Sequence, residues 1–351
     1  MVDKTKALTD QVLYGYAFRN LAMKTVDECF LACYEDCFCM SFQMCRQNTE
    51  CQLLSSNQFQ SPFALHSMMG CSYYDMVPDF EQFRPDKPAG GCNAGWECRP
   101  SINLCQNGGT YHSIAPTNRI SPRFKCNCTA GYAGNLCQTV AKSCRGYENS
   151  ERIPGKYKVF DEGMNLFEVF CDFDSGSRMT WTLILSYQFK HRVTFDKPYS
   201  KDLPKNQDSP RWDEYRLSKS RMQSIQKDSS HFRFTCKYDT DGMIYRDYLQ
   251  ASNDQLDILT YKNEKWCHMV DVINVRGQSC SKCTVFFHQE FYILHSDSHA
   301  AVSEGCQFQL AGGKTCGSYS EDAFGHYFCV NTEHRCSSSD SATTQTWFGS
   351  D

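Results

Sequence analysis

The residues best able to form covalent bonds in this sequence are its cysteines, which number 23 in 351 residues. That density is close to the one at which a chain is identified as a disulfide scaffold, and it indicates folding in an oxidising compartment. One pair, Cys280 and Cys283, has the C-x-x-C spacing that also occurs at redox centres and in halves of zinc sites. No βαβ pattern surrounds the pair and no second suitably spaced pair is evident, so we expect a structural disulfide.

Three carboxylates form the best candidate for a metal site. Asp239, Asp241 and Asp247 lie close together in sequence, with Gly242 among them, and could share a hard cation such as calcium. The full spacing of an EF-hand loop is absent, and Asp and Gly also favour ordinary turns. Calcium and a solvated turn are therefore the alternatives, and no other cofactor is predicted.

Catalytic motifs are incomplete elsewhere. Gly313–Thr315 (GKT) resembles the end of a phosphate loop, but Phe308 stands where that motif needs glycine. His288, His295 and His299 lie close together without the H-E-x-x-H spacing of a helical zinc site. No G-x-S-x-G elbow is present either. We therefore predict that the protein is not an enzyme.

Three blocks of sequence must position these residues. Residues 77–91 are rich in Pro and Gly, hold no cysteine and are typical of a linker, and a second boundary falls near residues 138–143. The blocks contain seven, six and ten cysteines. One cysteine of the first block is therefore expected to be free or to pair outside that block.

A helix is predicted to start in the first block. The run Thr25–Glu28 (TVDE) is a capping box, in which the side chain of each end residue bonds the backbone amide of the other. Cys29, Cys33 and Cys37 follow at four-residue intervals. On a helix they would share one face and attach it to neighbouring strands.

Short apolar strands are predicted after this helix, at Cys37–Phe42 and Cys51–Leu54. With YGYAF and DECFLAC before them, their order resembles the PAN/apple module over residues 8–76, a helix on an antiparallel sheet. Such modules bind proteins or carbohydrates without catalysis. The resemblance implies two disulfides, Cys29–Cys51 and Cys33–Cys39. Three further cysteines lie outside the family pattern, namely Cys37, Cys45 and Cys71.

The second block carries the most specific spacing. CQNGGTY (Cys105–Tyr111) and CNCTAGYAGNLC (Cys126–Cys137) resemble an EGF-like domain of β-hairpins, over residues 92–138. Asn107-Gly108 suits a tight turn that needs positive φ. Tyr111 stands where the family has its third cysteine, so another cysteine must replace the usual partner of Cys98. The expected disulfides are Cys105–Cys126, Cys128–Cys137 and Cys92–Cys98.

One sequon lies in this block. Asn127-Cys128-Thr129 is the only N-x-[ST] in the chain, so Asn127 is a candidate glycosylation site in a secreted protein. The flanking half-cystines could also hinder the transferase, and both outcomes stay open. The acidic pattern that lets some EGF-like domains bind calcium is absent before Arg99.

The third block, residues 144–351, opens with strand-like alternation around Tyr157 and Val169. This opening resembles fibrinogen-like domains and also intelectin-type lectins, and implies a Cys144–Cys171 disulfide and recognition of glycans or acetylated groups. Beyond residue 190 we expect a mixed α/β region. Its predicted elements are a helix around 216–226 and strands at 231–238 and 284–294.

Composition excludes several partners. Lys and Arg number 36 against 40 Asp and Glu, so no basic field favours nucleic acid. No apolar run approaches the roughly 18 residues that span a bilayer, so we expect no transmembrane segment and a soluble chain. No secretory leader follows Met1, and the start is expected to be truncated, wrongly assigned or already processed.

Together these patterns predict a secreted, multidomain α+β and disulfide-rich protein that binds glycans or extracellular proteins and does not catalyse. A structural matrix or adhesion component is the first alternative, and an enzyme within residues 190–351 is the second. Aromatic side chains could stack on sugars, although a core role is also expected for each. These aromatic residues are Trp212, Tyr215, Trp266 and Trp347.

Overall fold

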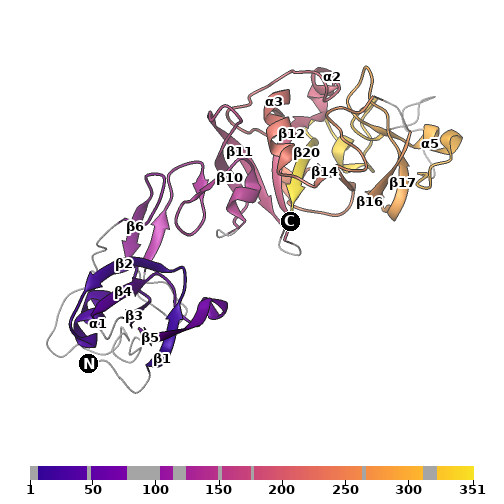
Figure 1. The fold of residues 1–351 in the computed structure, drawn as a ribbon. Helices are drawn as coiled ribbons and strands as arrows, with labels where there is room; N and C mark the ends of the chain where they lie inside the picture. Colours follow the sequence, from indigo (N-terminus) through magenta and orange to yellow (C-terminus); the bar gives the residue numbers. More distant parts are fainter. Residues whose placement is uncertain are drawn as a thin grey trace, which may run out of the picture. The chain divides into compact units, whose positions relative to one another are not determined.

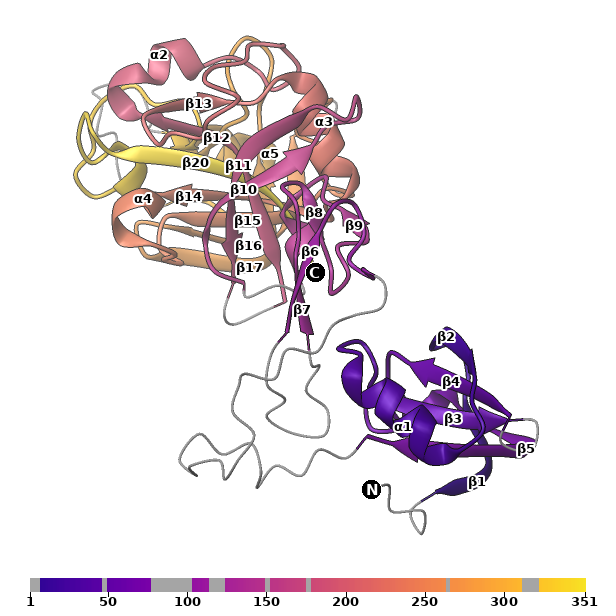
Figure 2. The same ribbon diagram turned by 90° about the vertical axis from the view of Figure 1, so that its left-hand side faces the viewer.

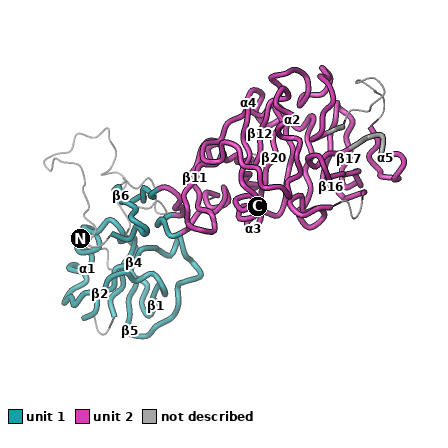
Figure 3. Tube along the Cα trace, turned by 90° about the horizontal axis from the view of Figure 1, so that it is seen from above, with its two compact units in different colours: residues 1–129, 135–138 teal, residues 130–134, 139–351 magenta. Residues whose placement is uncertain are grey.

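The computed structural model describes residues 7–45, 49–76, 103–113, 124–148, 152–174, 178–262, 266–310 and 322–351. They form two compact units, coloured separately in Figure 3. Unit 1 comprises residues 1–129 and 135–138, and unit 2 comprises residues 130–134 and 139–351. The predicted linker, residues 77–91, lies outside the described residues. Within the described residues, no helix combines the length and hydrophobicity that crossing a bilayer requires.

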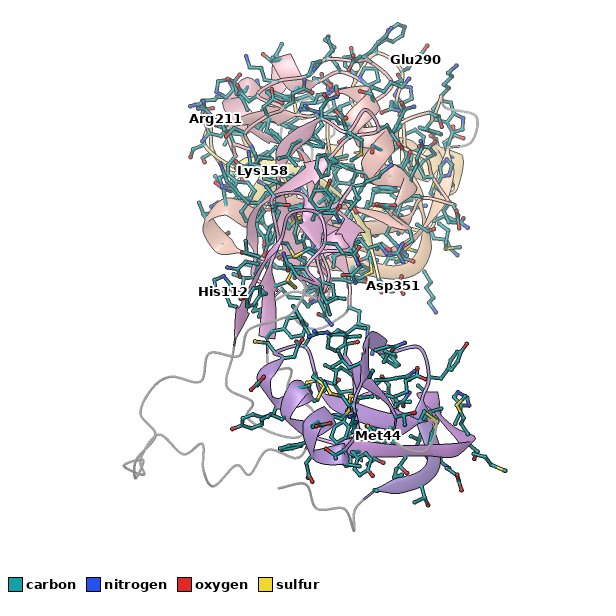
Figure 4. All side chains as sticks on the ribbon, turned by 60° about the vertical axis from the view of Figure 1, so that its left-hand side comes forward. Met44, His112, Lys158, Arg211, Glu290 and Asp351 are labelled. Carbon is teal, nitrogen blue, oxygen red and sulfur yellow. A yellow bond between two sulfur atoms is a disulfide. The ribbon has the colours of Figure 1, made fainter. Side chains whose placement is uncertain are left out.

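Unit 1 contains a five-stranded antiparallel sheet in the order β1-β5-β3-β4-β2, with one helix (Figure 1). Met44 of β3 is fully buried in this unit (Figure 4). The elements are β1 (Leu8–Leu13), β2 (Ala17–Ala22), α1 (Val26–Glu35), β3 (Ser41–Cys45), β4 (Glu50–Leu54) and β5 (Leu65–Asp75).

Helix α1 starts where the capping box predicts. The Glu28 amide donates to Thr25 Oγ1 at 3.2 Å, and the Thr25 amide donates to Glu28 Oε2 at 3.2 Å. Cys29 and Cys33 are buried on one face, as expected. Cys37 is not on the helix, because α1 ends at Glu35. Residues 36–40 form a turn, so the strand expected from Cys37 begins only at β3.

A two-stranded hairpin also belongs to unit 1, formed by β6 (Thr110–Ser113) and β7 (Phe124–Asn127). Asn107 and Gly108, before β6, have φ of 51° and 76°, the left-handed turn that this dipeptide predicts. The buried Phe38 ring meets the Phe124 ring edge-on at 4.2 Å. Phe38 lies in the turn that follows α1, so the hairpin packs against this turn within unit 1.

Unit 2 is built on a nine-stranded sheet in the order β10-β11-β12-β20-β14-β15-β16-β17, with β13 paired to β12. In Figure 2 the strands from β12 to β17 lie one below another in this order. The strands of the sheet are β10 (Gly155–Phe160), β11 (Leu166–Phe173), β12 (Thr180–Gln188), β13 (Glu214–Arg216), β14 (His231–Cys236), β15 (Tyr248–Ser252), β16 (Cys267–Val275), β17 (Gln278–Phe286) and β20 (Thr343–Ser350).

Short elements surround this sheet. The strand pairs are β8 (Tyr132–Ala133) with β9 (Thr139–Val140), and β18 (Ser296–Asp297) with β19 (Asp322–Phe324). The helices are α2 (Arg192–Phe195), α3 (Lys219–Lys227), α4 (Tyr238–Asp241) and α5 (Ser298–Glu304). Single 3₁₀ turns occur at Pro62–Ala64 in unit 1 and at Cys144–Tyr147, Phe189–His191 and Arg335–Ser337 in unit 2.

The region after residue 190 contains both helices and strands, as expected, and every described pairing between its sheet strands is antiparallel. The predicted helix at 216–226 begins only at Lys219, because residues 214–216 are strand β13. The predicted strand at 284–294 ends at Phe286. Strand β20 lies between β12 and β14 and is buried along its whole length.

A charged pair is buried in this core. The Arg233 guanidinium of β14 lies between two indole rings, 4.4 Å from Trp181 and 4.7 Å from Trp347. Its Nη2 donates to Asp172 Oδ2 at 2.6 Å, and the Tyr238 hydroxyl donates to Asp172 Oδ1 at 2.6 Å. Burial, followed by the Asp172 charge, raises the pKa of Tyr238 well above its ordinary value, so the phenol keeps its proton.

Candidate functional site

Disulfides occur within each of the two units, and their sulfur–sulfur bonds are drawn in yellow in Figure 4. Five expected pairs are present, namely Cys29–Cys51, Cys33–Cys39, Cys105–Cys126, Cys128–Cys137 and Cys144–Cys171. Four further pairs are Cys45–Cys71, Cys236–Cys336, Cys267–Cys306 and Cys280–Cys283. Cys37 is also disulfide-bonded, and its partner lies outside the first block, because the other six cysteines there pair with one another. The expected Cys92–Cys98 pair falls outside the described residues.

Cys280 and Cys283 form a disulfide within β17, the last strand of the sheet. Their sulfurs are bonded to each other, which leaves no thiolate for a zinc ion. The structural role expected from the sequence agrees with this arrangement.

The three candidate calcium ligands do not come together. The Thr343 hydroxyl donates to Asp239, and Asp241 pairs with Arg335 at 2.9 Å. Asp247 is fully buried and accepts the Arg276 amide at 2.6 Å. Arg335 bonds two of the three, because its backbone amide also donates to Asp247 Oδ2 at 3.1 Å. Each carboxylate therefore already accepts a hydrogen bond from the protein.

One other group of potential metal ligands exists among the described residues. Cys236, His334 and Cys336 have ligand atoms within 4.8 Å of one another, but the two sulfurs are joined in a disulfide. Such sulfurs lack the thiolate charge that binds zinc. The GKT run at 313–315 lies outside the described residues, as does the side chain of His299.

Asn127, the glycosylation candidate, is exposed at the end of β7. Its side-chain amide donates to Nε2 of His112 at 2.8 Å, and the adjacent Cys128 is crosslinked to Cys137. A glycan on Nδ2 would replace one of its two hydrogens and leave one N–H to donate to His112.

The aromatic residues singled out from the sequence divide into two groups. Trp347 and Tyr215 are fully buried, and Trp212 packs against the core, with its ring 6.4 Å from that of Trp347. Trp266 is 36% exposed, in the residue before β16. Only Trp266 of these four presents a large ring at the surface.

Trp266 begins a continuous series of ring contacts, which we call the aromatic row. The row comprises Trp266, His288, His295, His326, Tyr292 and Phe328. Its rings come from three chain segments, around residues 266, 288–295 and 326–328. The centroid distances are 5.5 Å for Trp266–His288, 5.3 Å for His288–His295, 5.5 Å for His295–His326, 4.3 Å for Tyr292–His326 and 4.7 Å for His326–Phe328.

Backbone pairing positions the first part of the row. The His288 and His295 backbones form a reciprocal bridge, with N–H···O distances of 2.9 and 3.0 Å. Gln289 is buried between them and donates to the carbonyls of Ile258 and Tyr261 at 3.0 and 3.1 Å. These bonds explain why the predicted strand 284–294 leaves the sheet as an anchored loop. Glu290 of this loop is exposed at the periphery of unit 2 (Figure 4).

A carboxylate positions the second part. Asp196, after α2, accepts the Ile293 amide at 3.1 Å and His326 Nδ1 at 2.6 Å. Asp196 therefore connects the 288–295 loop to His326. Sequence analysis missed both residues, because they are 130 positions apart and belong to no motif.

The His326–Asp196 pair has the arrangement of a base and its orienting carboxylate in nucleophilic catalysis. Within the described part of the chain, no Ser, Thr or Cys side chain hydrogen-bonds to His326. Besides Asp196, the described contacts of the His326 ring are those with Tyr292, His295 and Phe328.

No protein-family model and no curated protein matches the chain. Function is therefore inferred from the geometry of the site.

Proposed function

We propose that this chain is a secreted, non-catalytic recognition protein that binds carbohydrate or protein ligands at the cell surface or in the matrix. The aromatic row carries the proposal. Tyr292 and Phe328 both contact the His326 ring, and they are 44% and 43% exposed. Large rings with apolar faces and nearby polar edges suit stacking on sugar rings, and folded proteins otherwise tend to bury them.

Modular recognition is part of this proposal. The helix-bearing sheet of residues 8–76 would act as the PAN/apple module, the hairpins of 92–138 as the EGF-like module, and residues 144–351 as the fibrinogen-like or intelectin-like module. The disulfide pairs inside each block support these assignments, and so does the antiparallel sheet of unit 1. Linked modules raise overall affinity without new contacts, so each site can be weak.

The sulfur chemistry supports an extracellular location. Nine disulfides join described cysteines, a number that forms and persists in oxidising surroundings and is rare in a reducing cytosol. The proposal requires no cofactor.

A glycan array tests the proposal with the secreted full-length chain. We expect saturable signals that free sugar competes away. Tyr292→Ala should weaken them at least about tenfold, or roughly 1.4 kcal/mol, because it removes one stacking face. Tyr245→Ala is the matched control, since Tyr245 is an exposed aromatic of unit 2 outside the row. Equal losses in the two variants, or a Tyr292→Ala signal equal to the wild type, would contradict the assignment of this site.

A second candidate function is adhesion through protein partners, and unit 1 favours it. Phe63 and Met69 are 95% and 90% exposed, and Tyr14 packs edge-on against His66 at 6.2 Å. Exposed apolar side chains gathered on one module are typical of protein interaction sites. A silent glycan array, together with partner binding that Phe63→Asp abolishes, would favour this matrix or adhesion role.

A further inference from the structure

A concave site lies in unit 2, at residues that no sequence pattern singles out. Its cavity volume is about 530 Å³, within the usual range for small-molecule sites. Its polar lining includes Ser200, Lys219, Gln255, Asp257, Lys262 and His268. None of these residues belongs to the aromatic row.

Three elements place this lining. Lys219 is the first residue of α3, and its backbone amide donates to Asp202 Oδ1 at 2.8 Å. Asp257 lies in the turn after β15, where its carbonyl accepts the Tyr261 amide at 2.9 Å. His268 is the second residue of β16, and its Nδ1 donates to the Gln255 carbonyl at 2.8 Å. The pocket is therefore built on hydrogen-bonded backbone.

The pocket lining contains more cationic than anionic side chains. Asp257 is the one carboxylate in the lining, and both of its oxygens are already bonded. Its Oδ1 accepts Gln226 Nε2 at 2.7 Å, and its Oδ2 accepts the Thr260 hydroxyl at 2.5 Å. These donors offset the Asp257 charge inside the protein.

The cations lack such partners. Among the described residues, neither the Lys219 nor the Lys262 ammonium forms an ion pair. The carboxylate of Asp202 is also nearby. It is exposed to water and accepts the backbone amide of Lys219, the first residue of α3. Two ammonium groups against one satisfied carboxylate give the pocket a positive balance, and a concave site strengthens the resulting field.

We propose that this pocket binds a small polyhydroxylated anion, the chemistry of an acidic sugar carrying a carboxylate or sulfate. Lys219 and Lys262 supply charge-assisted donors for the anionic group. Ser200 and Gln255 supply neutral donors and acceptors for hydroxyl groups. The inference goes beyond the proposed function, because the site shares no residue with the aromatic row and stands without it.

The test is calorimetric titration of the full-length protein with glucuronate and with glucose 6-sulfate, using glucose as the neutral probe. We expect saturable binding of at least one acidic sugar, at least tenfold tighter than glucose and weakened between 50 and 500 mM salt, about as expected for exposed charges. An acidic polysaccharide built from glucuronate residues, titrated in parallel, distinguishes a polymer-bound acidic sugar from a free one.

Matched variants assign the binding to the pocket. Lys219→Met with Lys262→Met should reduce acidic-sugar affinity at least tenfold, whereas Lys158→Met with Lys190→Met removes the same charge elsewhere and should leave it unchanged. Tyr292→Ala should also leave it unchanged, which separates this result from the glycan-array test. Circular dichroism checks that each variant is folded. Equal binding of glucose and the acidic sugars, absence of binding by every acidic probe, or equal losses in the two lysine pairs would overturn the proposal.

Discussion

The buried Arg233–Asp172 pair offers the sharpest test of the unit 2 core. Asp172→Asn preserves the shape of the side chain and the acceptor for Tyr238, but it removes the counter-ion of a guanidinium that is only 1% exposed. At roughly 4 Å between charge centres and an effective dielectric constant of about 20, the lost attraction is about 4 kcal/mol. Breaking buried pairs typically costs about 3–5 kcal/mol, so the two magnitudes agree.

Urea unfolding with the disulfides intact measures this cost. Four of the five tryptophans lie in residues 139–351, and two of them flank Arg233, so tryptophan fluorescence reports on unit 2. We expect Asp172→Asn to lower the free energy of unfolding by about 3–5 kcal/mol with an unchanged urea dependence. Asp213→Asn, which breaks an exposed pair with Arg211, should leave the midpoint within error.

A double variant separates the ionic effect from packing. Asp172→Asn with Arg233→Met removes both charges, while the Met side chain still occupies the space between the indoles. The double variant should be more stable than Asp172→Asn alone, because it leaves no unpaired buried charge. If Asp172→Asn costs less than about 1 kcal/mol, or if the double variant is the less stable of the two, the reasoning is refuted.

Three further predictions concern a helix cap, two surface ion pairs and one disulfide. Thr25→Ala removes the N-cap of α1 and should cost about 1 kcal/mol, measured as faster hydrogen exchange of the α1 amides. The ammonium groups of Lys227 and Lys142 hold the pKa of Glu162 at about 2, below its ordinary 4.5, so these ion pairs favour the folded state above pH 4.5 and are lost as pH falls toward 2. Carboxyl NMR titration should show this value, and Lys227→Met should raise it. Replacing both Cys236 and Cys336, which are 100 positions apart, with Ser should lower the free energy of unfolding in urea by about 4.7 kcal/mol.

The outcomes that would contradict them are specific. If Thr25→Ala leaves hydrogen exchange of the α1 amides unchanged, then the N-cap does not limit the local unfolding of α1. A Glu162 pKa near 4.5 in the wild type would show that Lys142 and Lys227 do not stabilise the Glu162 carboxylate. A serine double variant as stable as the wild type would show that the Cys236–Cys336 loop is already ordered in the unfolded chain.

Features set by neighbouring residues could be predicted from the sequence. The capping box located α1, and Asn107-Gly108 located a turn with positive φ. The five expected disulfides close loops of at most 27 residues, so cysteine order and family resemblance were sufficient to pair them. The end of α1 was harder to predict, because the spacing of Cys37 continued the helical pattern past Asp36, which caps the helix.

Features that depend on distant segments could not be predicted. His326 and Asp196 meet across 130 positions, and the aromatic row needs three segments at once. The 287–295 segment looks like a continuing apolar strand, but the contacts of Gln289 with Ile258 and Tyr261 make it a loop. Tertiary packing outweighed local pattern at each of these places.

The central position of β20 sets the order in which unit 2 can assemble during synthesis. Thr180 of β12 pairs with Ser350, so the middle of the sheet stays open until residue 350 has left the ribosome. Until then β12 and β14 each present an unpaired edge to chaperones and to other nascent chains. Such long-range closure is slow, so folding of this unit should depend on the eight-residue strand β20 more than on any surface loop.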